Sequence, residues 1–166
     1  MRRTKIFVKI SGDIIKRPDV IEWVRSIAFG RNYIVICTGG GSQINEEFKR
    51  RGIPPDFGPL GRATKSFEER QIARDVLEKN QAEVQDLLSD NGIHAEVIIP
   101  VLDLGTVLCH VNGDILVLAA YHGFDKLFVL TLEGREEKKT EEFGKYPKIE
   151  VIGFPVRDEE KIRKAV

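Results

Sequence analysis

Three consecutive glycines, Gly39, Gly40 and Gly41, follow an apolar segment and precede Ser42, a residue that can cap a helix. Glycines let backbone N–H groups approach an anion closely, and the dipole of a following helix favours negative charge at its N-terminus. The run is neither a P-loop nor a dinucleotide-binding fingerprint, because no Gly-Lys-Ser/Thr follows and Ile44 occupies the place of the last glycine. It is either an anion-binding loop or only a tight strand-to-helix turn.

Other polar residues occur where apolar segments end. Lys9 interrupts a first apolar segment that stops at Ser11-Gly12, and a cation there can face a ligand, although an isolated strand lysine more often reaches solvent. Asn112 and Asp114 stand at a later helix start, where capping is their ordinary role. Arg62 follows a proline-rich loop and by itself would be a surface residue. Each signal is weak alone, and their combination indicates a site.

The elements that position these residues follow from apolar periodicity and from turn residues. Buried strands are predicted at 5–10, 33–38, 95–101, 106–111, 126–131 and 149–152. Helices are predicted from Pro18 to Gly30, at 42–51, from the Ser66–Glu69 capping box to 91–92, at 112–123 and at 157–166, with a loop at 52–62 and a solvated excursion at 133–148. This alternation predicts an α/β fold with a mostly parallel sheet under helices on both faces. Ligands bind outside the carboxyl ends of such strands.

Composition limits the kind of protein. The chain has 166 residues, 42% of them hydrophobic, and 26 basic side chains balance 26 acidic ones. The length fits one domain covering 1–166, and the zero net charge argues against a nucleic-acid partner. No segment approaches the roughly 20 apolar residues that cross a bilayer, and no secretory signal is present, so a cytoplasmic protein without a membrane partner is expected. Cys37 and Cys109 are expected to be buried free thiols, and the three histidines lack metal-ligand spacing.

Several motifs occur in an order that resembles the amino acid kinase family, particularly its acetylglutamate kinase and UMP kinase branches. They are Val-Lys-Ile-Ser-Gly at 8–12, Val-Ile-Cys-Thr-Gly-Gly-Gly-Ser-Gln-Ile-Asn at 35–45, Arg-Gly-Ile-Pro-Pro-Asp-Phe at 51–57, Gly-Arg-Ala-Thr at 61–64, Val-Leu-Glu-Lys-Asn at 76–80, Val-Asn-Gly-Asp at 111–114 and Leu-Phe-Val-Leu-Thr at 127–131. The resemblance spans most of the chain. It implies a three-layer αβα sandwich of the carbamate kinase type and, as in that family, a homo-oligomer.

The resemblance also implies a function. The expected reaction is transfer of a phosphoryl group from ATP, with Mg²⁺, to a carboxylate or phosphate of a small anionic metabolite. Lys9 would neutralise charge on the transferring group and Asp114 would orient Lys9, while Arg62 and Asn112 would hold the acceptor. The phosphate-binding residues would be Ser11, Gly12, Gly39, Gly40 and Gly41. No metal-ligating residue is predicted.

Two departures keep a second hypothesis open. Leu132 stands where the family usually has an aspartate, and the chain ends at Val166, before the family's nucleotide-binding half and its second active-site lysine. The alternative is a catalytically inactive member that acts as a ligand-binding or scaffold subunit. A scaffold has no packing need for a charged Lys9 or Arg62 at strand and loop ends, which favours the kinase. Amino acids, acyl amino acids and nucleoside phosphates all remain open as acceptors.

Overall fold

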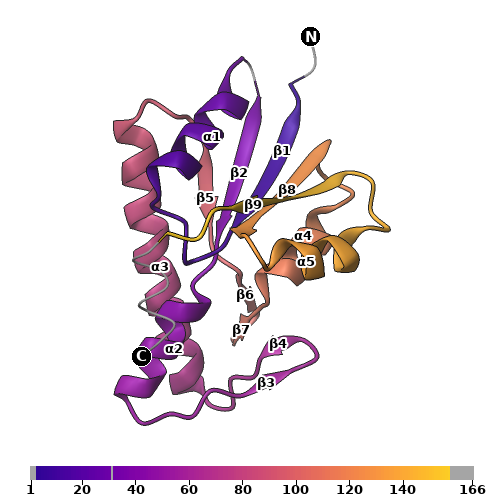
Figure 1. Ribbon diagram of the computed structural model, residues 1–166. Helices are drawn as coiled ribbons and strands as arrows, with labels where there is room; N and C mark the ends of the chain where they lie inside the picture. Colours follow the sequence, from indigo (N-terminus) through magenta and orange to yellow (C-terminus); the bar gives the residue numbers. More distant parts are fainter. Residues whose placement is uncertain (1–2, 31, 158–166) are drawn as a thin grey trace.

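Five parallel strands form the central sheet of this protein, whose computed structural model describes residues 3–30 and 32–157 (Figure 1). In spatial order they are β5 (Glu96–Ile98), β2 (Tyr33–Thr38), β1 (Lys5–Ile10), β8 (Lys126–Leu132) and β9 (Ile149–Phe154). Every pairing between neighbours is parallel, and Ile10 at the end of β1 lies beside Thr38 and Leu130. The carboxyl ends of β1, β2 and β8 therefore meet at one edge.

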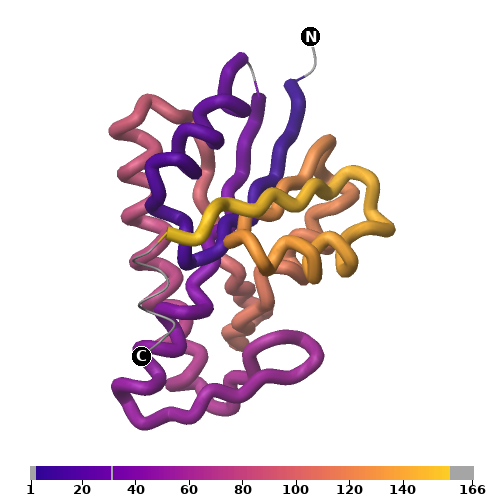
Figure 2. Tube along the Cα trace, in the orientation of Figure 1, coloured from indigo at the N-terminus to yellow at the C-terminus, as the bar shows by residue number. Residues whose placement is uncertain are grey.

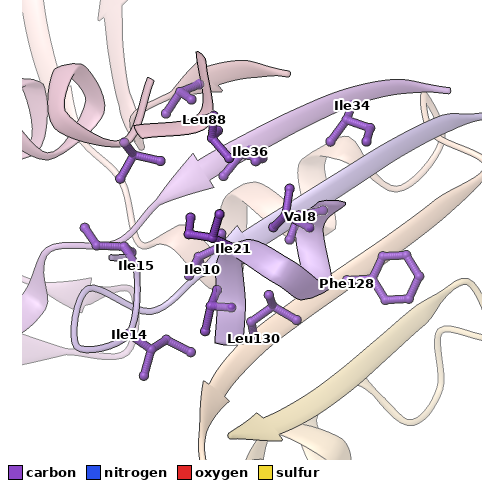
Figure 3. Packing of buried hydrophobic residues seen from close by; sticks show 14 of the residues in the cluster. Val8, Ile10, Ile14, Ile15, Ile21, Ile34, Ile36, Leu88, Phe128 and Leu130 are labelled. Atoms are coloured by element: carbon purple, nitrogen blue, oxygen red, sulfur yellow. The ribbon is translucent and has the colours of Figure 1, made fainter. Parts of the chain in front are cut away.

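Side chains alternate between the two faces along each strand, so each face of the sheet packs into its own hydrophobic core. Ile6, Val8 and Ile10 pack with α1 (Pro18–Ala28) and α3 (Phe67–Asp90) on one face. Figure 3 shows Val8 and Ile10 in this cluster. Phe7 points the other way, toward α4 (Gly113–Ala120) and the buried Phe143 of α5 (Glu136–Phe143). The tube in Figure 2 follows the chain through these layers. The predicted three-layer αβα sandwich with a mostly parallel sheet is confirmed.

The segments between these layers differ in part from the sequence-based expectation. Helix α2 (Gly41–Arg50) begins earlier than predicted, with Gly40 rather than Ser42 at its N-cap. The loop at 52–62 contains a short hairpin of β3 (Phe57–Gly58) and β4 (Gly61–Arg62). The strand predicted at 95–101 is only Glu96–Ile98, because Pro100 has no N–H for a ladder bond. The one predicted at 106–111 is β7 (Val107–His110), which pairs antiparallel with β6 (Val101–Leu104) outside the main sheet.

Helix ends show which local signals were reliable. The predicted N-cap is present, since Ser66 Oγ accepts from the N–H of Glu69 at 3.1 Å, while the Glu69 carboxylate accepts from the N–H of Lys65 at 2.6 Å. The excursion expected at 133–148 is largely exposed, as predicted, but it contains a helix that was not predicted, α5, which Phe143, only 1% exposed, anchors to the core. The terminal helix predicted at 157–166 falls, apart from residue 157, outside the described residues. Within those residues no helix is long and apolar enough to cross a membrane.

Candidate functional site

A cleft of about 400 Å³ opens at the carboxyl ends of β1, β2 and β8. From β1 the chain proceeds first to β2 and β5 on one side, and later to β8 and β9 on the other. The β1–β8 boundary is therefore the topological switch point, where open α/β sheets bind ligands. The β3–β4 hairpin and the residues between β7 and α4 complete the walls.

The structure brings the sequence-predicted residues together at this cleft. Those that line it are Lys9, Ser11, Gly12, Gly39, Gly40, Gly41, Arg62 and Asn112. The ninth, Asp114, lies in the first turn of α4 and contacts Lys9. Their proximity follows from the parallel register of the strands, and their role in binding stays a prediction.

The glycines fall into two groups by what surrounds them. A Cβ on Gly12 would lie 3.0 Å from the carbonyl oxygen of Gly39, and one on Gly39 would lie 2.9 Å from the nitrogen of Gly12. These two glycines therefore allow the turns after β1 and β2 to pack against each other. A Cβ on Gly41 would meet nothing within 4 Å, so the N-terminus of α2 is the open part of the loop.

Two lysines share one carboxylate at the base of the cleft. Lys9 Nζ lies 3.3 Å from one oxygen of Asp114, and Lys139 of α5 contacts the other oxygen. Burial lowers the pKa of Lys9, and the charge of Lys139 lowers it further, although Asp114 opposes both effects. Burial alone would raise the pKa of Asp114, but the two lysine charges outweigh it and hold that pKa below its usual value.

Arg62 is held rigidly on the opposite wall. Its Nη2 donates to the carbonyl of Gly41 at 3.0 Å and to Oδ1 of Asn45 at 2.7 Å. Its guanidinium lies over the rings of Phe48 and Phe57, 5.3 and 4.8 Å from their centroids. Its other terminal nitrogen, Nη1, is buried and has no hydrogen-bond partner among the described residues. A fixed guanidinium with a spare donor suits a carboxylate.

Two further cleft residues lack hydrogen-bond partners, and sequence reasoning missed both. Nδ1 of His110 and Oγ1 of Thr131 are buried, and neither bonds to any residue that the structure describes. Burial, together with the charge of Arg62, lowers the pKa of His110 to about 4, so its imidazole is neutral at pH 7. Buried polar atoms without a protein partner are positions where a ligand or water binds. The position of Thr131 near the carboxyl end of β8 is the signal by which the sequence could have identified it as a cleft residue.

Helix α5 and its N-cap residue Arg135 supply two more cations that sequence reasoning assigned to a solvated face. Lys139 contacts Asp114, and Arg135 lies 2.8 Å from Asp13 at the cleft mouth. The cations at the cleft are Lys9, Arg62, Arg135 and Lys139, against the carboxylates of Asp13 and Asp114. Counted over residues 3–30 and 32–157, the site therefore has an excess of two positive charges while His110 is neutral. No group of acidic, histidine and cysteine side chains within the described part of the chain could hold a metal ion.

A second groove, of about 860 Å³, lies between α1, α2 and α3. Its charged side chains include ion pairs such as Lys16 with Glu83 and Arg50 with Glu47. Internal pairing of this kind leaves less uncompensated charge for a ligand than the strand-end cleft does.

Comparison with known proteins gives structural neighbours only. No protein-family model matches the chain, and no curated protein sequence does. Smu.665 from Streptococcus mutans UA159 is similar with a TM-score of 0.60 and 13% identity, over 84% of this chain and 83% of the other. N-acetylglutamate synthase from Neisseria gonorrhoeae, complexed with coenzyme A and N-acetylglutamate, is similar with a TM-score of 0.53 and 14% identity over 80% of this chain. The same synthase complexed with coenzyme A and L-arginine gives 0.53 and 12% over 78%.

The likeness, at these identities, shows the fold alone. This chain spans 42% and 44% of the two synthase chains. The neighbours nevertheless overturn the expected identification as an amino acid kinase, because they are an acetylglutamate synthase complexed with coenzyme A and a protein named only as Smu.665. The expected ATP-dependent phosphoryl transfer and the expected cofactors, ATP and Mg²⁺, are overturned with it. The alternative, an inactive kinase-family member used as a ligand-binding or scaffold subunit, is not supported either.

Proposed function

We propose that the strand-end cleft binds a small carboxylate metabolite of the N-acyl amino acid class. One observation carries the proposal: among the residues that the structure describes, four cations converge on the cleft and two carboxylates balance them. Arg62, fixed by Gly41 and Asn45, presents its free Nη1 to a carboxylate. The open amides at the start of α2 favour an anion as well.

The positive charge of the cleft favours one of the two small ligands complexed with the neighbouring synthase, N-acetylglutamate and L-arginine. N-acetylglutamate has two carboxylates and no ammonium group, so its charge complements the excess at the cleft. L-arginine is a cation at neutral pH and would be repelled by the same residues. The neutral imidazole of His110, beside Arg62, offers an uncharged hydrogen-bond partner for an amide.

Coenzyme A does not fit this cleft. A volume of about 400 Å³ matches a small metabolite, and the three phosphate groups of the coenzyme would bring more negative charge than the excess of two can balance. The cleft is therefore proposed to bind the acyl amino acid and not the coenzyme.

Titration calorimetry with N-acetyl-L-glutamate tests the proposal. Binding is expected, and Arg62→Lys should weaken it by about tenfold or more, because lysine lacks the planar fork that pairs with a carboxylate. Arg50→Gln is the matched control, since Arg50 is an exposed α2 residue paired with Glu47 away from the cleft. Absence of binding, or equal binding by the Arg62→Lys variant and the wild type, would overturn the proposal.

A further inference from the structure

Three residues from separate elements line the cleft beside the β1–β8 boundary. They are Lys9 of β1, Thr131 of β8 and Lys139 of α5. We call them the β8 corner. Sequence reasoning had assigned a role only to Lys9 among them.

Thr131 gives the first indication of a ligand at the β8 corner. The residue is fully buried, yet its Oγ1 has no hydrogen-bond partner within residues 3–30 and 32–157. A buried hydroxyl without a partner is destabilising, so such groups are usually satisfied by water or by a bound molecule. Thr131 is also one of the residues that line the cleft.

Uncompensated charge gives the second, independent indication. Lys9 and Lys139 both contact Asp114, and their side chains are 11% and 18% exposed. One carboxylate balances one ammonium group, which leaves a net positive charge in a largely dry site. An isolated buried charge is costly, and an anion beside it lowers that cost.

We propose that the β8 corner is a second anion subsite, which receives the distal carboxylate of a dicarboxylate whose other end binds Arg62. This inference rests on the proposed function and narrows its ligand to acyl amino acids with an acidic side chain. The carboxylate accepts hydrogen bonds from the Thr131 hydroxyl and from the lysine ammonium groups, while Asp114 holds the two lysines in place. Lys139 is thus a specificity-determining residue.

A matched pair of ligands measures what the second carboxylate contributes. N-acetyl-L-glutamate and N-acetyl-L-glutamine have the same shape and differ by one charge. We expect the wild type to prefer the glutamate compound by about tenfold or more, as charge-assisted hydrogen bonds imply. Lys139→Met should remove most of this preference without changing affinity for the glutamine compound. Lys138→Met, an exposed neighbour on the same helix, should keep the wild-type preference. Equal loss for both ligands, or no preference in the wild type, would overturn the inference.

Inorganic sulfate tests the subsite without any organic ligand. Thermal midpoints are compared in sodium sulfate and in sodium chloride of equal ionic strength. The rise caused by sulfate should be larger in the wild type and in Lys138→Met than in Lys139→Met. An equal rise in all three would overturn the subsite even if N-acetyl-L-glutamate binds elsewhere in the cleft. A Lys139-dependent rise without binding of either acyl amino acid would retain the subsite and reject the proposed function.

Discussion

Lys139 of α5 donates a hydrogen bond to Asp114 of α4, across 25 residues of sequence. Local sequence explains the position of Asp114, because the first turn of a helix favours a carboxylate. The contact with Lys139 has no local reason and depends on how α5 follows β8. Together with Lys9, this pair makes the base of the cleft a shared charge site rather than an isolated ion pair.

Removing the charge of Asp114 should destabilise the fold. Asp114→Asn leaves the ammonium groups of Lys9 and Lys139 buried without their counter-ion, and we expect the free energy of unfolding to fall by about 3 kcal/mol. Urea denaturation at neutral pH measures it. Asp13→Asn is the control, because the ion pair of Asp13 with the exposed Arg135 is expected to contribute less than about 1 kcal/mol. Equal losses in the two variants would contradict the shared charge site.

Thr131→Val should affect ligand binding and stability differently. Valine has nearly the same shape and removes a buried hydroxyl that has no partner among the described residues, so the unfolding free energy should stay equal or rise by up to about 1 kcal/mol. Affinity for N-acetyl-L-glutamate should fall. A loss of stability above about 1 kcal/mol would mean that the hydroxyl already has a hydrogen bond in the free protein.

Neighbouring glycines of the loop should respond in opposite ways to alanine. A Cβ on Gly40 would lie 2.8 Å from Cδ2 of Leu77, so Gly40→Ala should separate α2 from α3 and lower stability by about 1–3 kcal/mol. Gly41→Ala meets no atom within 4 Å and lies in the first turn of α2, so it should be neutral or stabilising by up to about 1 kcal/mol. Thermal unfolding of the two variants makes the comparison, and a reversed order would contradict the packing described here.

His110 should make stability depend on pH. Its pKa is lowered from 6.5 to about 4 in the folded protein, so between these values the unfolded chain binds the proton more readily. Its contribution is therefore complete above pH 6.5 and is lost as the pH falls toward 4. One proton gives a slope of at most about 1.4 kcal/mol per pH unit.

The variant His110→Gln isolates this contribution from that of the carboxylates, which titrate in the same range in both proteins. Denaturation across this pH range should show a shallower loss of stability in the variant than in the wild type. Parallel curves would show that the imidazole is not held neutral in the fold.

Local signals predicted the frame of the site well. The apolar runs around Lys9 and Cys37 gave β1 and β2, and the Ser66 capping box gave the start of α3. Because parallel strands end at one edge, the residues following those runs had to meet. The order of the strands and helices along the chain therefore predicted where the cleft lies without any knowledge of side-chain contacts.

The residues that sequence reasoning missed depend on tertiary packing. Lys139 lies in a charged segment that reads as a solvated face, and only the burial of Phe143 turns α5 toward the sheet. His110 carries no local pattern, since its lowered pKa arises from burial and from Arg62, a residue of a different hairpin. The ordered motifs predicted the fold class correctly, whereas the activity inferred from them was wrong.

Backbone amide NMR during a titration with N-acetyl-L-glutamate shows directly whether the strand-end cleft is the binding site. We predict that the largest chemical-shift changes occur at amides that border the strand-end cleft alone, those of Gly41, Asn112 and Gly113, and that amides bordering only the second groove change little. Saturating changes at the cleft amides would locate the ligand at the switch point of the sheet. Changes confined to the second groove, or none at all, would contradict the assignment of this cleft as the binding site.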